Sequence, residues 1–224
     1  MDIQHVIWDW NGTLLDDVQA CVDAINILLE RRSLPPVNPE RYTEIFGFPV
    51  QNYYRTLGVD LDSEDWDSLA REFHDAYAST ARNAALRRGA LDTLAQIRSD
   101  RVPMSVLSAS ERSILETMLA QRRVSSFFEH VYGLSDLYAR SKLHLGRRLL
   151  SELSVPPGAI LLIGDTTHDF EVARELACRC VLVAGGHQAK ARLRQCASEA
   201  LFDDVGEVAS FLRTGSRDSG RVRS

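Results

Sequence analysis

The chain alternates short apolar runs with segments of helical periodicity from Gly89 onward, and this alternation constrains the fold more than any other feature. Strands are predicted at Pro103–Leu107, His130–Tyr132, Ala159–Ile163, Cys180–Val183 and Ala200–Phe202. Helices are predicted between and after them, at Leu91–Arg98, Glu111–Arg122, Lys142–Leu153, Asp169–Ala177 and Val205–Leu212. Alternation of this kind is typical of a parallel sheet covered by helices on both faces. We therefore expect an α/β chain with a doubly wound core.

A further strand is predicted near the beginning of the chain, where Ile3–Trp8 is an apolar, partly β-branched run. Asp9 follows at its carboxyl end, the edge at which open α/β sheets bind ligands. Gly12 and Thr13 then form a turn. Asp9 is therefore placed like a reactive group.

The segment 17–85 is predicted to be entirely helical. Its first helix has Val18, Val22, Ile25 and Leu29 on one face, and the prolines at 35, 36 and 39 end it. Further helices are predicted near Glu40–Phe46, Val50–Leu57 and Ser63–Arg82. We interpret residues 1–16 and 86–213 as one α/β core and 17–85 as an inserted helical unit. Residues 214–224, rich in Gly, Ser and Arg, are predicted to be a disordered tail.

Composition excludes several classes of function. The 224 residues carry 26 Lys and Arg against 31 Asp and Glu, a net charge of −5. Such a balance predicts neither a nucleic-acid partner nor an anionic membrane surface. No stretch is apolar enough to span a membrane, the start is unlike a signal peptide, and the four cysteines lack zinc spacing. We expect a cytoplasmic protein with reduced thiols, and its oligomeric state stays open.

Polar clusters stand at the ends of three predicted strands. They are Asp9–Thr13, Ser108–Ser110 and Asp165–Asp169, and Lys142 stands at the expected start of a helix. The carboxyl ends of parallel strands meet at one edge, so these groups should converge. Carboxylates, a hydroxyl, helix-terminal N–H groups and an ammonium are the parts that hold a divalent cation and a phosphate.

These motifs resemble the haloacid dehalogenase (HAD) superfamily, most closely its phosphoglycolate-phosphatase-like members. Asp9-Trp-Asn-Gly-Thr-Leu14 is similar to the first motif, Ser108 to the second, Lys142 to the third and Gly164-Asp-Thr-Thr-His-Asp169 to the fourth. The resemblance covers nearly the whole chain. It implies a Rossmann-like core, a helical cap inserted after the first motif, and a small phosphorylated metabolite as substrate.

The resemblance also implies roles for individual residues. Asp9 would attack phosphorus and form an aspartyl-phosphate that water hydrolyses, and Mg²⁺ would be held by the Asp9 side chain, the backbone carbonyl of Asn11 and Asp165. Asp169 would orient a metal-bound water or pair with Lys142, and Thr13 would brace Asp9. Ser108, the following backbone N–H of Ala109, and Lys142 would bind the phosphoryl oxygens.

Asn11 departs from the family pattern, in which an Asp at this position protonates the leaving alcohol. An amide does not exchange its proton near neutral pH, and proton transfer contributes roughly 10²- to 10⁴-fold to rate. Three alternatives follow: His168 or His74 supplies the proton, the leaving group needs no acid, or the protein binds a phosphorylated ligand with little turnover. We favour a working phosphatase. Dehalogenation and phosphomutase activity fit the motifs less well.

Several other residues receive a structural interpretation. The aromatic side chains Phe46, Phe48, Tyr53 and Tyr54 could line a substrate pocket, with Arg41 or Arg55 reaching a second anion, but we favour a role in holding small helices together. The pair Asp16-Asp17 is expected at a helix start, where acids are favoured. Gly185-Gly186-His187 is expected to be a turn, and Arg87-Arg88 a solvated hinge.

Overall fold

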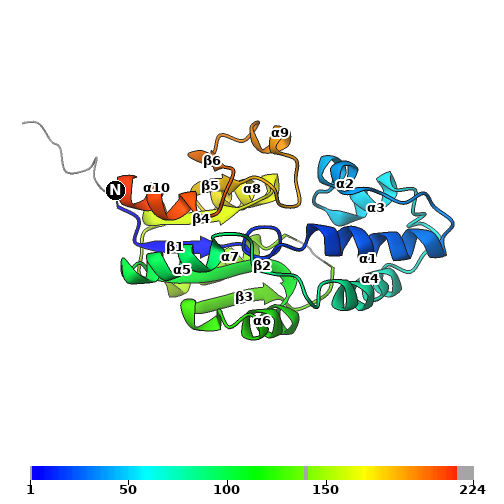
Figure 1. Cartoon of the computed structure of the whole chain (residues 1–224), viewed down its shortest axis with the longest axis horizontal. Helices are drawn as coiled ribbons and strands as arrows, with labels where there is room; N and C mark the ends of the chain where they lie inside the picture. Colours follow the sequence, from blue (N-terminus) through cyan, green and yellow to red (C-terminus); the bar gives the residue numbers. More distant parts are fainter. Residues whose placement is uncertain (1, 139–140, 216–224) are drawn as a thin grey trace, which may run out of the picture.

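The structure, a computed structural model, describes residues 2–138 and 141–215, and an α/β fold with six parallel strands emerges (Figure 1). The strands are β1 (His5–Trp8), β2 (Met104–Glu111), β3 (His130–Leu134), β4 (Ile160–Gly164), β5 (Arg179–Val183) and β6 (Ala200–Phe202). They lie in the order β3-β2-β1-β4-β5-β6, and every pair is parallel. This confirms the doubly wound sheet.

Helices cover both faces of the sheet, and a separate group of helices lies beyond the carboxyl ends of the strands. Four precede β2 in a helical cap: α1 (Val18–Arg31), α2 (Pro39–Ile45), α3 (Val50–Thr56) and α4 (Trp66–Thr80). The others are α5 (Ala90–Ser99), α6 (Arg112–Gln121), α7 (Leu143–Glu152), α8 (Thr167–Glu175), α9 (Lys190–Leu193) and α10 (Glu207–Gly215), with short 3₁₀ turns at Ser125–Phe127 and Pro157–Ala159. Figure 1 shows the strands pointing toward the cap.

Alternation along the strands divides the core into two layers. Val6 and Trp8 of β1 belong to one apolar cluster, whereas Ile7 between them belongs to the other. The first cluster takes in α5, α6 and α10, and the second takes in α7, α8 and α9. The central strands β1, β4 and β5 and the first five residues of β2 are therefore buried on both faces, which is why these runs are nearly all apolar, whereas the edge strand β6 is half-buried.

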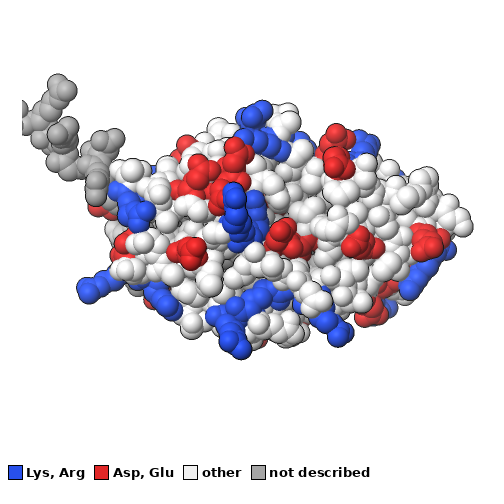
Figure 2. Space-filling model, in the orientation of Figure 1, with Lys and Arg blue, Asp and Glu red and all other residues white. Residues whose placement is uncertain are grey.

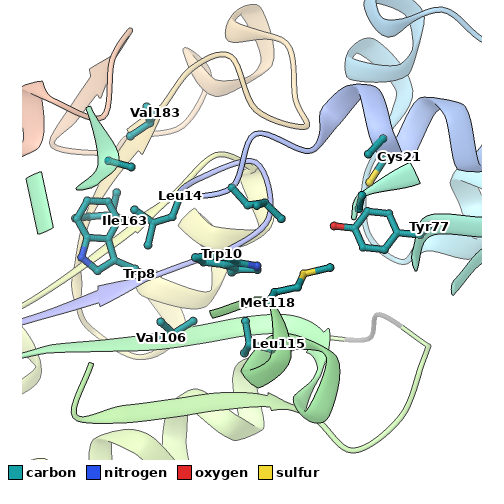
Figure 3. Packing of buried hydrophobic residues seen from close by; sticks show 14 of the residues in the cluster. Trp8, Trp10, Leu14, Cys21, Tyr77, Val106, Leu115, Met118, Ile163 and Val183 are labelled. Carbon is teal, nitrogen blue, oxygen red and sulfur yellow. The ribbon is translucent and has the colours of Figure 1, made fainter. Parts of the chain in front are cut away.

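The first apolar cluster also continues into the cap. Figure 3 shows it running from Trp8 and Ile163 in the sheet, past Trp10, to Cys21 and Tyr77. All five side chains are at least nine-tenths buried. The cap is thus packed on the core through a shared apolar layer, directly above the ends of the central strands.

The boundaries of some elements differ from the sequence predictions. Strand β2 continues to Glu111, so Ser108 lies within it, at an irregularity in its register with β3. Helix α8 begins at Thr167 because Thr166 and Asp169 form a reciprocal capping box. The tail prediction is wrong for Thr214 and Gly215, which belong to α10, and residues 216–224 lie outside the described residues.

Surface charge is mixed. Basic and acidic side chains are interspersed over the face drawn in Figure 2. Among the helices of the described residues, none is long and apolar enough to cross a membrane.

Candidate active site

The centre of the site is a buried ion cluster at the carboxyl end of β1. Lys142 stands at the N-terminal cap of α7, and its ammonium donates to Asp9 Oδ1 and to the Leu107 carbonyl at 2.9 Å. The same ammonium lies 2.6 Å from Asp169 Oδ1. These three side chains come from three separate segments, and the structure brings them together as the strand-end argument predicts.

Asp165 completes the cluster at the end of β4. Its Oδ1 accepts a hydrogen bond from Thr13 Oγ1 at 2.6 Å, and its Oδ2 accepts one from the His187 backbone N–H at 2.6 Å. Two glycines make room for it: a Cβ on Gly12 or on Gly186 would lie 2.4 Å or 2.2 Å from Asp165 Oδ2. Gly12 also has a φ of +70°, which favours glycine. The loops on both sides are thus shaped around this carboxylate.

The carboxylates of the cluster have perturbed pKa values. Burial raises the pKa of Asp9 to about 7 against the opposing charge of Lys142, and the carboxylates of Asp169 and Asp165 add to the rise. Burial opposes ionisation of Asp169 as well, but Lys142 holds the pKa of that carboxyl below its usual range. Asp169 is therefore the ionised partner of Lys142, and Asp9 gains or loses its proton near neutrality.

A metal ion suits this donor set. Asp9, Asp165 and Asp169 each offer a buried carboxylate oxygen, and these oxygens lie within 4.8 Å of one another. Mg²⁺ prefers hard oxygen ligands, and a cation would relieve the repulsion among three buried carboxylates. The residues present therefore fit a magnesium ion.

Ser108, Ala109 and Ser110 face this cluster from β2. They line the same cavity as Asp9 and Lys142. Ser108 is buried, and its Oγ accepts a hydrogen bond from the Ser110 backbone N–H at 3.1 Å. The irregularity in β2 thus presents hydroxyl and backbone groups beside the carboxylate of Asp9.

The side chain of Asn11 is held on three sides. Its amide donates to Asp17 Oδ2 at 2.7 Å and to the Tyr77 hydroxyl at 2.9 Å, and its carbonyl accepts from Ser110 Oγ at 2.6 Å. Asp17 stands at the start of α1, as predicted, but its carboxylate makes no helix-capping hydrogen bond and is buried. Asp17 instead accepts from the Gly12 N–H and Tyr77 and faces His187 Nε2 at 3.2 Å.

His187 also has a contact role that the turn interpretation underrated. Its Nδ1 lies 2.9 Å from the Tyr42 hydroxyl of α2, and the ring lines the cavity. Burial alone would lower the pKa of His187, but the Asp17 carboxylate raises it to about 9. His187 and Asp17 are therefore an ion pair that joins the loop after β5 to the start of the cap.

The prediction of a solvated hinge at Arg87-Arg88 is wrong for Arg87. Arg87 is half-buried and donates to the carbonyls of Gly12 at 2.9 Å and Ala184 at 2.6 Å. Arg88 is exposed and pairs with Asp204. Arg87 thus ties together the two loops that enclose Asp165.

A cavity of about 140 Å³ lies between this cluster and the cap. Four aromatic side chains both pack on one another and line this cavity: Phe46, Phe48, Tyr53 and Tyr54. They therefore hold the small helices together and also form a pocket wall. Arg41 and Arg55 are exposed and do not line it. His74 and His168 do, and burial lowers the pKa of each ring.

Sequence reasoning missed Asp17 and Tyr77 as parts of the site. Tyr77 is 66 residues from Asn11 and comes from the middle of α4, where its periodicity indicates only a buried face. Thr166 had a usable signal, since Thr-x-x-Asp is a capping-box pattern.

The chain is similar to known proteins over most of its length. A family model described as Haloacid dehalogenase-like hydrolase matches residues 6–183. The chain is similar to the phosphoglycolate phosphatase of Synechococcus elongatus, with 25% identity over 212 residues that cover 92% of this chain and 95% of the relative. It is also similar to the N-acetylmuramic acid 6-phosphate phosphatase of Pseudomonas aeruginosa, with 28% identity over 193 residues and 84% of each chain covered.

A solved structure shares the fold. The haloacid dehalogenase-like hydrolase of Streptococcus pneumoniae superposes with a TM-score of 0.77 and 21% identity, covering 93% of this chain and 98% of the other. The core and inserted cap are thus a known arrangement.

Proposed function

Because this chain belongs to the haloacid dehalogenase-like hydrolases, we propose that it is a Mg²⁺-dependent phosphatase that hydrolyses a small phosphorylated metabolite through an aspartyl-phosphate formed on Asp9. Its relatives named phosphatases place it among the phosphoric monoester hydrolases. The observation that supports the mechanism is the contact of a buried Asp9 carboxylate with Lys142, at the edge of a cavity that reaches the cap.

Asp9 acts as the nucleophile in this proposal. It lies at the end of a buried strand, and Thr13 and Lys142 restrict its orientation. In-line attack on phosphorus breaks the bond to the leaving oxygen and leaves the phosphoryl group on Asp9. Water then attacks that phosphorus, which releases phosphate and restores the carboxylate.

Mg²⁺ would be held by the side chains of Asp9 and Asp165 and by the backbone carbonyl of Asn11, with Asp169 orienting its surroundings. When bound, the ion offsets the negative charge of the phosphoryl group and of the attacking carboxylate. The same argument gives Lys142 a second task, since its ammonium lies beside Asp9 and can offset charge on the phosphoryl oxygens. Ser108 and the backbone N–H of Ala109, which line the same cavity from β2, would bind those oxygens as well.

The cap, which we place at residues 17–85 against a core of 1–16 and 86–213, controls access. Its two connections run side by side: Asp16 N–H donates to Ala85 and Arg87 N–H donates to Leu14, each at 2.9 Å. Paired connections allow the cap to rotate as a unit, which would exclude water during attack and admit it afterwards.

The test of this mechanism compares two single variants. Asp9→Asn removes the proposed nucleophile, and Asp92→Asn, at an exposed position of α5, is the control. Asp9→Asn is expected to abolish hydrolysis of acetyl phosphate, whereas Asp92→Asn leaves the rate unchanged. Removal of divalent ions with a chelator should stop the wild type, and added Mg²⁺ should restore it. Wild-type hydrolysis by Asp9→Asn, or full activity in chelator, would refute the proposal.

The intermediate can be tested separately. Acid-quenched wild-type protein should carry a phosphoryl group on the peptide that contains Asp9, detectable by mass spectrometry and removed by hydroxylamine. No observation favours the alternative of a phospho-ligand binder with little turnover, and we propose no second function.

A further inference from the structure

The cavity above Asp9 has mainly aromatic walls on its cap side. On the cap side it is lined by aromatic rings, which are Tyr42, Phe46, Phe48, Tyr53, Tyr54, Trp66, Phe73 and Tyr77. Several are arranged edge to face, with centroids 5.4–5.9 Å apart. Phe48 lies over the His168 ring, with centroids 4.6 Å apart. Such walls favour contact with a flat ring or another apolar group.

Four polar atoms in these walls have no hydrogen-bond partner within the described part of the chain. They are the Tyr53 hydroxyl, Trp66 Nε1, His74 Nδ1 and His168 Nε2. All four residues line the cavity, and Tyr53 and His168 are more than nine-tenths buried. A buried polar group without a partner is destabilising, and because these four atoms are closed off from the cavity as the walls stand, a ligand supplies the missing hydrogen bonds where the surrounding rings move aside.

The cations that line the cavity are already neutralised. Among the described residues, Lys142 is the single Lys or Arg of the lining, and it is paired with Asp9 and Asp169. His187 is paired with Asp17. A second anionic group on a substrate, such as a carboxylate, would therefore meet aromatic carbon and neutral polar atoms in this lining, where an unpaired charge is unfavourable.

We infer that the phosphatase substrate carries an uncharged aromatic leaving group with neutral hydrogen-bonding atoms, rather than a second anionic group. This inference rests on the proposed function and adds the class of leaving group. The phosphoryl end lies at Asp9 and Lys142, and the ring lies between Phe48 and the aromatic side chains of α3 and α4.

The test compares three esters of primary alcohols, so that leaving-group acidity does not decide the outcome. They are benzyl phosphate, 4-carbamoylbenzyl phosphate and phosphoglycolate. We expect kcat/KM for benzyl phosphate to exceed that for phosphoglycolate by about tenfold or more, since a buried ring adds binding energy. The carbamoyl ester should be better still, because it offers neutral hydrogen-bonding atoms to the unpartnered wall.

Variants connect the preference to the wall. Phe48→Ala should raise KM for benzyl phosphate about tenfold and raise that for acetyl phosphate much less, because acetyl phosphate has no ring to pack against the wall. Phe170→Ala, a half-buried phenylalanine of α8 that lines a different surface hollow, is the matched control. Tyr53→Phe should remove the advantage of the carbamoyl ester, whereas Tyr132→Phe on β3 should keep it.

The outcomes separate the two proposals. If acetyl phosphate and all three esters are inert, the proposed function fails. If acetyl phosphate is hydrolysed but phosphoglycolate is preferred to benzyl phosphate, the phosphatase stands and the aromatic leaving group is refuted. Equal kcat/KM for the benzyl and carbamoylbenzyl esters would refute the hydrogen-bonding part.

Discussion

The Asn11 amide Nδ2 donates a hydrogen bond of 2.7 Å to the Asp17 carboxylate Oδ2. Burial opposes ionisation of Asp17, but His187 holds the pKa of its carboxyl below the usual range, so Asp17 is the charged member. Asn11 must donate to it. The amide at position 11 therefore suits a site next to a charged carboxylate, although it has no acidic proton to give.

The pairing of Asn11 with Asp17 predicts how stability changes when a carboxyl is placed at position 11. Asn11→Asp alone places a second carboxyl against Asp17, which should lower the free energy of unfolding at pH 8 by about 1–3 kcal/mol. A carboxyl beside a like charge has a raised pKa, so this loss should shrink as the pH falls and the proton returns. Thermal melts at pH 6 and pH 8 measure both effects.

The double variant Asn11→Asp/Asp17→Asn restores a single charge, and its melting temperature should recover in part, because the exchange also removes the carboxylate partner of His187. It also supplies a titratable group beside the phosphoryl site. We expect it to hydrolyse benzyl phosphate roughly 10²-fold faster than wild type, with little gain for acetyl phosphate, whose leaving group needs no acid. A folded double variant with the wild-type rate on benzyl phosphate would show that proton transfer does not depend on position 11.

Sequence reasoning located residues that follow strands and missed residues that reach the site from helices. Asp9, Ser108 and Asp165 could be placed because parallel strands end at a common edge. Asp17 could not, since an acid before a helix is ordinarily a cap and only the packing of α4 above it buries its carboxylate. The partners of Asn11 depend on tertiary contacts that no local pattern records.

At the level of elements, the loop after β5 fastens the cap through α2. The Ala189 N–H donates to the Thr43 carbonyl at 2.9 Å, and Gln188 Nε2 donates to the Phe46 carbonyl at 3.0 Å. Arg192 donates to the Phe46 carbonyl as well. The Oε1 of Gln188 accepts from Thr167 N–H at 2.8 Å, so one side chain joins the cap to the first turn of α8.

Gln188→Ala should loosen this connection. Loss of its two hydrogen bonds leaves the Thr167 N–H without that partner and weakens the hold on Phe46, at a cost of about 1–3 kcal/mol. We expect faster amide exchange over residues 42–46 and a higher KM, with little change in exchange within the strands. The exposed Gln195→Ala is the control, and unchanged exchange at 42–46 in Gln188→Ala would contradict the connection.

The elements themselves were largely predictable, because strands buried on both faces are continuous apolar runs and the helices between them are amphipathic. Errors occurred where a local cap or tertiary pairing sets a boundary. β2 runs to Glu111 because that residue pairs with Leu134 of β3 beyond an irregularity in register. The four-residue α9 is too short for its periodicity to be visible.

For the molecule as a whole, the ion cluster connects stability to pH and to Mg²⁺. The pKa of Asp9 is raised to about 7 in the folded protein from its ordinary value of 3.8. A raised carboxyl pKa means that folding favours the protonated form, so this contribution to stability is present below pH 3.8 and is lost as the pH rises through 7. Between pH 6 and pH 8, in the absence of metal, Asp9 alone should lower the free energy of unfolding by about 1 kcal/mol.

His187 contributes in the same direction, because its pKa of about 9 makes its stabilising charge disappear as the pH rises through that value. The contribution of Asp9 is therefore isolated by comparison with Asp9→Asn, which keeps the pair of Lys142 with Asp169. In chelator, denaturant titrations should show a smaller loss between pH 6 and pH 8 for Asp9→Asn than for wild type, and a higher stability at pH 8.

With Mg²⁺ present, wild type should become more stable at pH 8 than Asp9→Asn. A metal ion competes with protons for Asp9, so its apparent affinity should fall as the pH drops below about 7. Added at 100 times its dissociation constant, it should stabilise the folded wild type by about 2.7 kcal/mol, and less for Asp9→Asn at the same concentration. Equal stabilisation of both proteins by Mg²⁺ at pH 8 would mean that Asp9 is not a ligand, and the melting temperatures at graded Mg²⁺ concentrations decide between these outcomes.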